Sequence, residues 1–210
     1  SQVVEIGDWS DATIELKDAV TAFSLSKVEH LLQKAFSNYP APICSEHLLK
    51  PLFAELSLID DHGAALGFAE SELVRYALMR TNAKVAKKRP SETVLLIAGY
   101  QTPIWRLALM ALELTDVKFS VHLLTHSFSV AAAIELAQKF EKAYTVFYQD
   151  GLWKDADKDL MNKLSLYKNR LFLCGTAPVL ANVYAEGRVF KNSNACISEL
   201  IKHQTTLHNV

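Results

Sequence analysis

The spacing of apolar residues changes near residue 90, and this change constrains the fold more than any other feature of the sequence. Before that point apolar side chains recur every three or four residues, which is typical of helices that bury one face. After Pro90 short apolar runs alternate with stretches of helical length. Strands that alternate with helices predict a parallel sheet with helices on both faces. We therefore expect two domains, a helical bundle over residues 1–90 and an α/β domain over residues 91–210.

The first ninety residues predict a bundle of about four helices. A weak helical pattern covers Ala12–Phe23, and a capped amphipathic segment starts at Ser26. A third segment starts at Cys44 and contains Pro51, which we expect to kink the helix or to lie in its first turn. The fourth starts at Phe68 and ends in a basic run before the next proline.

The remaining residues predict strands that alternate with helices. The expected strands are Thr93–Ala98, Phe119–Leu124, Tyr144–Tyr148, Leu171–Cys174 and Val189–Phe190. The expected helices are Pro103–Leu114, Ser129–Lys142, Asp155–Tyr167, Pro178–Ala185 and Ser193–His203. This pattern is typical of a flavodoxin-like, or Rossmann-like, five-stranded parallel sheet.

Composition narrows the classes of function. The chain has 22 basic and 23 acidic residues, so no overall positive field attracts nucleic-acid phosphates. Its 7 glycines are about half the usual share and leave few places where a backbone can closely approach a large cofactor. Cys44, Cys174 and Cys196 lie far apart, which favours a reducing cytoplasm over a disulfide framework. No apolar run approaches the ~18–20 residues of a membrane span, so we expect a cytoplasmic protein.

In a doubly wound sheet, ligands bind outside the carboxyl ends of the strands. The residues that follow the expected strands are polar or aromatic, and helix N-termini that could accept an anion or a flat ligand come next. The same residues could also be ordinary caps and turns. The candidate crevice residues are Gln101, Thr102, Trp105, Thr125, His126, Gly175 and Thr176.

Other groups of reactive residues are weaker candidates. His122 and His126 are four residues apart, but on a strand and a following loop that spacing does not place them on one face. The acidic run Asp155–Asp159 lacks the glycine and glutamate of a calcium loop and suits a helix N-terminus. Cys174 has no histidine nearby in the sequence to activate it, and we expect a small buried side chain. We therefore expect neither an enzyme nor a metal site.

Three segments carry a family resemblance. Lys50–Leu56 looks like a bundle segment, Leu95–Gln101 looks like a first strand with the start of a ligand loop, and Cys174–Ala177 looks like a Gly-Gly loop after a fourth strand. Together with the order of the two domains, they resemble the cobalamin-binding sensor region of MerR-type transcription regulators. Methionine synthase pairs the same two modules. The resemblance extends from about Ala12 to His203 and implies a cobalamin-binding-type fold.

The positions that contact cobalamin in that family are altered in this sequence. The family's first loop reads Gly-Glu-x-His-x-x-Gly, and its histidine can ligate cobalt. Aligned from Gly99, Thr102 stands at the histidine, and threonine is a poor ligand beside imidazole. Trp105 stands at the second glycine and would fill space for the nucleotide tail, and of the Gly-Gly pair Gly175 remains. The bundle's tryptophan and Glu-His pair correspond to Asp61, Ser71 and Glu72.

We therefore expect a cobalamin-type fold whose cobalamin site is lost, with ligation through His126 as the alternative. The resemblance implies the C-terminal sensor or effector region of a MerR-like bacterial transcription regulator, controlled by a small molecule or by its oligomeric state. Its DNA-binding helices would precede Ser1, and the bundle would support a homo-oligomer. The alternatives are a stand-alone antirepressor-like interaction module, and a photosensor or methyl-transfer module that binds cobalamin or another tetrapyrrole.

Overall fold

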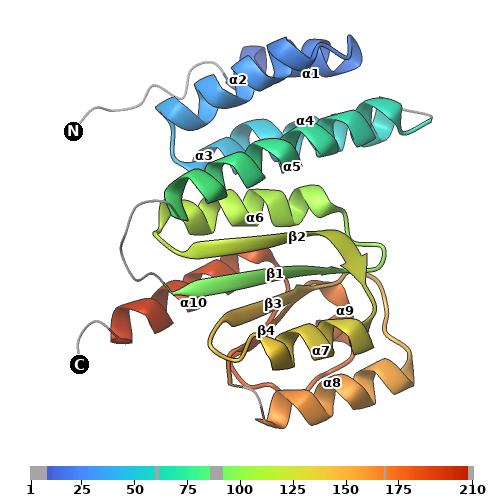
Figure 1. The fold of residues 1–210 in the computed structure, drawn as a ribbon. Coiled ribbons are helices and arrows are strands. Elements are labelled where there is room, and N and C mark those ends of the chain that lie inside the picture. Colours follow the sequence, from blue (N-terminus) through green and yellow to red (C-terminus); the bar gives the residue numbers. More distant parts are fainter. Residues whose placement is uncertain (1–8, 60–61, 86–91, 168, 208–210) are drawn as a thin grey trace. The chain divides into compact units, whose positions relative to one another are not determined.

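A computed structural model describes residues 9–59, 62–85, 92–167 and 169–207 (Figure 1). The chain forms two compact units, residues 1–77 and residues 78–210, and the division falls within helix α5 (Ala64–Val85). We call them the first and the second unit. The domain boundary expected between residues 90 and 91 stays a prediction.

The described part of the first unit is helical, as the apolar spacing predicts. Its elements are α1 (Trp9–Thr21), α2 (Leu25–Asn38), α3 (Ala41–Cys44), the π-helical turn η1 (Ser45–Leu49), α4 (Lys50–Ile59) and the first part of α5. In α2, Val28, Leu32 and Phe36 are buried at the expected spacing of four residues. The helix begins before Ser26, because the Ser24 carbonyl already accepts a hydrogen bond from the Val28 amide at 3.0 Å.

Pro51 explains the break between α3 and α4. A proline has no N–H to donate to the carbonyl four residues earlier, and its ring crowds the preceding turn. The chain adapts with the π-turn η1, after which the Lys50 amide donates to the Ser45 carbonyl five residues back. Pro51 is then the second residue of α4, in its first turn, as the sequence predicts.

The second unit contains a five-stranded parallel sheet with the strand order β2-β1-β3-β4-β5. This is the flavodoxin-like order, so the predicted fold class is confirmed. The strands are β1 (Thr93–Gly99), β2 (Ser120–Phe128), β3 (Tyr144–Tyr148), β4 (Leu171–Cys174) and β5 (Val189–Phe190). The helices are α6 (Ile104–Asp116), α7 (Val130–Lys139), α8 (Asp155–Tyr167), α9 (Thr176–Leu180) and α10 (Ser193–Leu207).

Several elements differ from their predicted bounds, and the differences at β2 and α9 have a clear structural cause. Strand β2 continues to Phe128, because the pairing with β1 shifts register after Leu96 and resumes with Ala98 opposite Ser127. Helix α9 begins at Thr176, immediately after Gly175 turns the chain with a φ of 102°, and it ends at Leu180 rather than Ala185.

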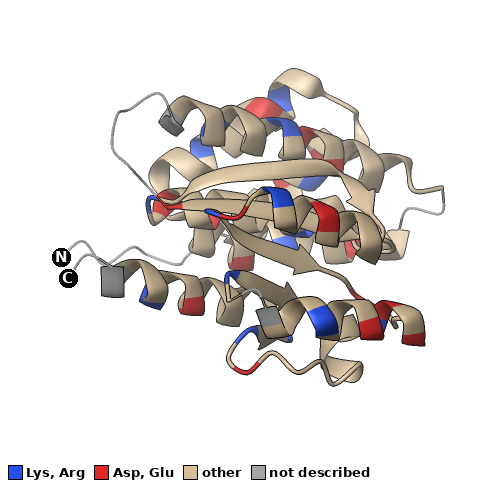
Figure 2. Ribbon diagram, turned by 60° about the horizontal axis from the view of Figure 1, so that its bottom comes forward, with Lys and Arg blue, Asp and Glu red and all other residues tan. Residues whose placement is uncertain are grey.

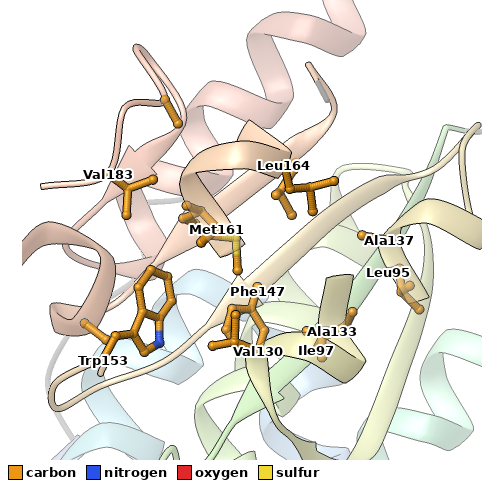
Figure 3. Close-up of a cluster of buried hydrophobic side chains, with 14 residues drawn as sticks. Leu95, Ile97, Val130, Ala133, Ala137, Phe147, Trp153, Met161, Leu164 and Val183 are labelled. Atoms are coloured by element: carbon orange, nitrogen blue, oxygen red, sulfur yellow. The ribbon is translucent and has the colours of Figure 1, made fainter. Parts of the chain in front are cut away.

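One hydrophobic cluster of the second unit lies on the face of the sheet covered by α7 and α8 (Figure 3). Phe147 of β3 stacks on Trp153 with ring centroids 6.1 Å apart, and Met161 of α8 packs in the same cluster. Strand β1 is buried along its whole apolar run, from Val94 to Ala98. A run of this kind is typical of a central parallel strand with both faces covered.

Figure 2 shows basic and acidic residues interspersed along the helices. Asp155 and Asp157 lie in the first turn of α8, where the positive end of the helix dipole stabilises them. No helix in the described part of the chain has both the length and the apolar character that crossing a membrane requires.

Candidate functional site

Asp150 connects the loops that follow β1, β3 and β4. Its backbone amide donates to the Thr102 hydroxyl at 3.1 Å, and its Oδ1 accepts from the Thr176 amide at 3.2 Å. The Thr176 hydroxyl in turn accepts from the Gly151 amide at 2.8 Å. These loops lie at the carboxyl edge of the sheet, where doubly wound domains bind ligands. Here the polar groups of the loops bond to one another.

Gln149 occupies the space beside two glycines of this edge. A Cβ added to Gly99 would lie 2.4 Å from Oε1 of Gln149, and one added to Gly175 would lie 2.3 Å from the Gln149 carbonyl oxygen. The Gln149 Oε1 also accepts from the Trp153 indole N–H at 2.7 Å, which fixes the side chain in place. Both glycines therefore make room for the chain's own Gln149.

The structure brings Thr102, Gly175 and Thr176 together around Asp150. Thr102 is buried, with 4% of its surface exposed. Gln101 is exposed at the turn before it, with a φ of 65°. Trp105 is half-buried on α6, and the Arg106 guanidinium lies 5.0 Å from the centre of its ring.

Thr125 and His126 do not lie in a loop, and that expectation is wrong. Both belong to β2, which continues past the predicted end because the strand resumes pairing after its register shift. Both side chains are exposed, and the His126 ring meets Phe128 edge to face at 5.6 Å. His126 thus lies on an edge strand of the sheet, one residue before the pairing of Ser127 with Ala98.

Asp150 and Arg106 belong to this edge of the sheet but are not among the predicted site residues. Arg106 lies with its Nε 4.0 Å from Oδ2 of Asp150, and its positive charge also acts on Tyr148. Burial, helped by the nearby Cys174 and Asp150, raises the pKa of Tyr148 to about 12, although Arg106 acts in the opposite direction. Tyr148 is therefore neutral at physiological pH. The position of Asp150 directly after an apolar strand was the signal that could have identified it.

Two buried cysteines lie close to this edge of the sheet. Cys174 ends β4 and Cys196 lies on α10, and both are fully buried, as expected for Cys174. A hydrogen bond with Cys174, together with burial, raises the pKa of the Cys196 thiol. Cys196 is therefore a protonated thiol at neutral pH and a poor nucleophile.

The residues at this edge do not fit a cobalt-ligating loop. In the resembling family a histidine on the loop after the first strand can ligate cobalt. Here Thr102 stands at that position, and its buried hydroxyl already accepts a hydrogen bond. An alcohol oxygen is a poor ligand for a metal that imidazole suits. The space beside Gly99 and Gly175 is taken by Gln149.

No protein-family model matches the sequence, and no curated protein matches it. Among solved structures, the monomethylamine corrinoid protein of Methanosarcina barkeri is similar, with a TM-score of 0.59 and 13% identity. The similarity covers 93% of this chain and 100% of that one. A cobalamin-binding protein of Desulfitobacterium hafniense aligns with a TM-score of 0.38 and 11% identity over 93% of this chain and 97% of that one. The second score is too low to support an argument, and the first establishes a cobalamin-binding-type fold.

Proposed function

We propose that this chain is a sensor or effector region of a MerR-like transcription regulator that works without cobalamin. Its DNA-binding helices would belong to a segment that precedes Ser1, and a small molecule or the oligomeric state would control it. It would act in the cytoplasm, as a homo-oligomer, and would catalyse no reaction. The fold it shares with the corrinoid protein supports the module type.

The hydrogen bonds between the loops are the main support for a chain that does not bind cobalamin. The Thr102 hydroxyl, at the position of the cobalt-ligating histidine, is buried and accepts the Asp150 amide, while Asp150 accepts the Thr176 amide. Opening these loops for a corrin would break both hydrogen bonds and leave partly buried polar groups unpaired, at up to about 1–3 kcal/mol for each group. A regulatory module that keeps the fold but not the cofactor accounts for these closed loops.

The test is a titration of the full chain with hydroxocobalamin, methylcobalamin and adenosylcobalamin, followed by absorbance and by calorimetry. We expect no shift of the corrin bands and no heat of binding. One-to-one binding of any of the three would overturn the proposal. Light scattering of the same sample measures the oligomeric state, and a purely monomeric chain would contradict control by oligomerisation.

The coding sequence upstream of Ser1 distinguishes the transcription regulator from a stand-alone antirepressor-like module. A helix-turn-helix encoded directly before Ser1 supports the regulator, and its absence supports the stand-alone module.

A cobalamin-binding methyl-transfer module is the second candidate. The likeness to the whole length of a corrinoid protein favours it, as does the exposed His126 near the carboxyl edge of the sheet. If His126 ligates cobalt, the His126→Ala variant loses binding of hydroxocobalamin. The matched His122→Ala variant, also exposed on β2, keeps it.

A further inference from the structure

A cavity in the first unit has apolar and aromatic walls. Its volume is about 220 Å³, and it lies among α1, α2 and η1. Leu16, Leu31 and Leu48 form apolar walls, and Trp9 and Tyr39 add two aromatic rings with centroids 4.8 Å apart. This volume is small beside the ~300–1,000 Å³ of typical ligand pockets. This is room for a small organic molecule but not for a large cofactor.

Two oppositely charged side chains also line this cavity. Glu15 comes from α1 and Lys34 from α2, and both are exposed. Within the described part of the chain, neither has a hydrogen bond or an ion pair. Two other charges on these helices are paired: Lys17 bonds to Glu55 at 2.9 Å, and Glu29 bonds to Arg75 at 3.3 Å.

The geometry points to a binding site for a free α-amino acid with an apolar or aromatic side chain. The side chain would lie between Trp9, Tyr39 and the leucines. The ligand ammonium would face the Glu15 carboxylate, and its carboxylate would face the Lys34 ammonium. A few polar groups that fix the orientation of an apolar body are typical of small-molecule sites. The charges at the cavity select a ligand that carries both signs.

Alternative ligands match this set of residues less well. A simple carboxylate would bring its charge close to Glu15, and a simple amine would bring its charge close to Lys34. Each would therefore gain one attraction and meet one repulsion. An amino acid gains both attractions. The amino-acid site itself does not depend on the proposed function, because the cavity lies wholly in the first unit. A role of its ligand as the effector rests on the proposed function.

The experiment compares three probes of nearly equal size by calorimetry on the full chain. L-Phenylalanine carries both charges, 3-phenylpropanoate lacks the ammonium, and 2-phenylethylamine lacks the carboxylate. We expect L-phenylalanine to bind about tenfold more tightly than either of the others. Quenching of Trp9 fluorescence in a variant with Trp105→Phe and Trp153→Phe reports binding at the cavity itself.

Matched variants separate the two charges of the site from the general charge of the helices. Lys34→Ala and Glu15→Gln should each weaken L-phenylalanine binding about fivefold or more. Lys27→Ala on α2 and Asp11→Asn on α1 change exposed charges that do not line the cavity, so binding should stay within about twofold. All four positions are exposed, so the variants should fold, and circular dichroism verifies this.

The inference is overturned if L-phenylalanine, L-leucine and L-tryptophan all fail to bind at about 10 mM. It is also overturned if the three phenyl probes bind equally, or if Lys34→Ala behaves like Lys27→Ala. None of these results bears on the cobalamin titration, which tests the second unit.

Discussion

The structure gives a different reason for the glycine at position 175 than the sequence does. From the sequence, Gly175 looks like the remnant of a cofactor-binding loop. In the structure its missing side chain gives room to the Gln149 carbonyl, and its φ of 102° suits glycine alone. The sequence signal was real, but the group that needs the space belongs to the chain itself.

Thr102 is central both to the proposed loss of the cobalamin site and to the stability of the loops around Asp150. Thr102→Val keeps the shape of the side chain but leaves the Asp150 amide without its acceptor. We expect the free energy of unfolding to fall by about 1–3 kcal/mol, the cost of an unpaired buried polar group. Urea denaturation measures it. The Thr102→Ser control keeps the hydroxyl, and an equal loss in both variants would show that the hydrogen bond is not the cause.

Gly175→Ala tests the close approach of Gln149. The added Cβ would lie 2.3 Å from a backbone oxygen that no side-chain rotation can move, so the loops must shift. The control is Gly187→Ala, where φ is also positive, at 68°, but no atom lies within 4 Å of the new Cβ. We expect the control to cost about 1–2 kcal/mol from backbone strain and Gly175→Ala to cost at least about 2 kcal/mol more. Equal unfolding midpoints would contradict this.

At the scale of whole elements, local patterns predict some bounds well and others poorly. The bounds of β3, α8, β4 and β5 match the prediction, because an apolar run or an acidic N-terminus marks each within its own sequence. The end of β2 depends on a register shift against β1, and the start of α9 depends on the turn at Gly175. Both come from neighbouring strands and loops. The hydrogen bonds of Asp150 likewise could not be predicted from a local pattern, since its partners Thr102 and Thr176 are distant in the sequence.

We expect the hydrogen bonds of Arg188 to hold the short strand β5 against β4. Arg188 donates through Nη1 to the Leu171 carbonyl at 3.3 Å and through Nη2 to the Ser165 carbonyl at 2.5 Å. Its own carbonyl accepts from the Leu173 amide at 2.7 Å, which begins the pairing of β5 with β4. Arg188→Met keeps the length of the side chain and removes the donors.

We expect this variant to lose about 1–3 kcal/mol of stability and to let β5 open locally. Hydrogen exchange should speed up about tenfold or more at the Leu173 and Gly175 amides, which donate to the Arg188 and Phe190 carbonyls, and not at Leu96 in the centre of the sheet. Lys191→Met, an exposed neighbour of β5, is the control. Unchanged exchange at Leu173 and Gly175 would show that Arg188 does not hold the strand.

For the whole molecule, the order of elements was enough to predict the fold, whereas function depends on a few loop residues. The sequence is 13% identical to the corrinoid protein and yet shares its fold, because burial patterns survive substitutions that keep side chains apolar. Loop residues such as Thr102 have no such tolerance, since one side chain decides whether a metal has a ligand. Fold and function therefore become predictable from the sequence to different degrees.

The low net charge of the chain predicts that it does not bind DNA non-specifically. The chain carries a net charge of −1, and basic and acidic residues are interspersed along the helices that the structure describes (Figure 2). Proteins that bind DNA non-specifically do so at Kd values of about 10⁻⁴–10⁻⁶ M through many phosphate contacts. We expect residues 1–210 to leave the anisotropy of a labelled duplex unchanged up to about 100 μM at physiological salt. Binding that weakens steeply with added salt would contradict the assignment of DNA contacts to a segment before Ser1, because it would locate those contacts in this chain.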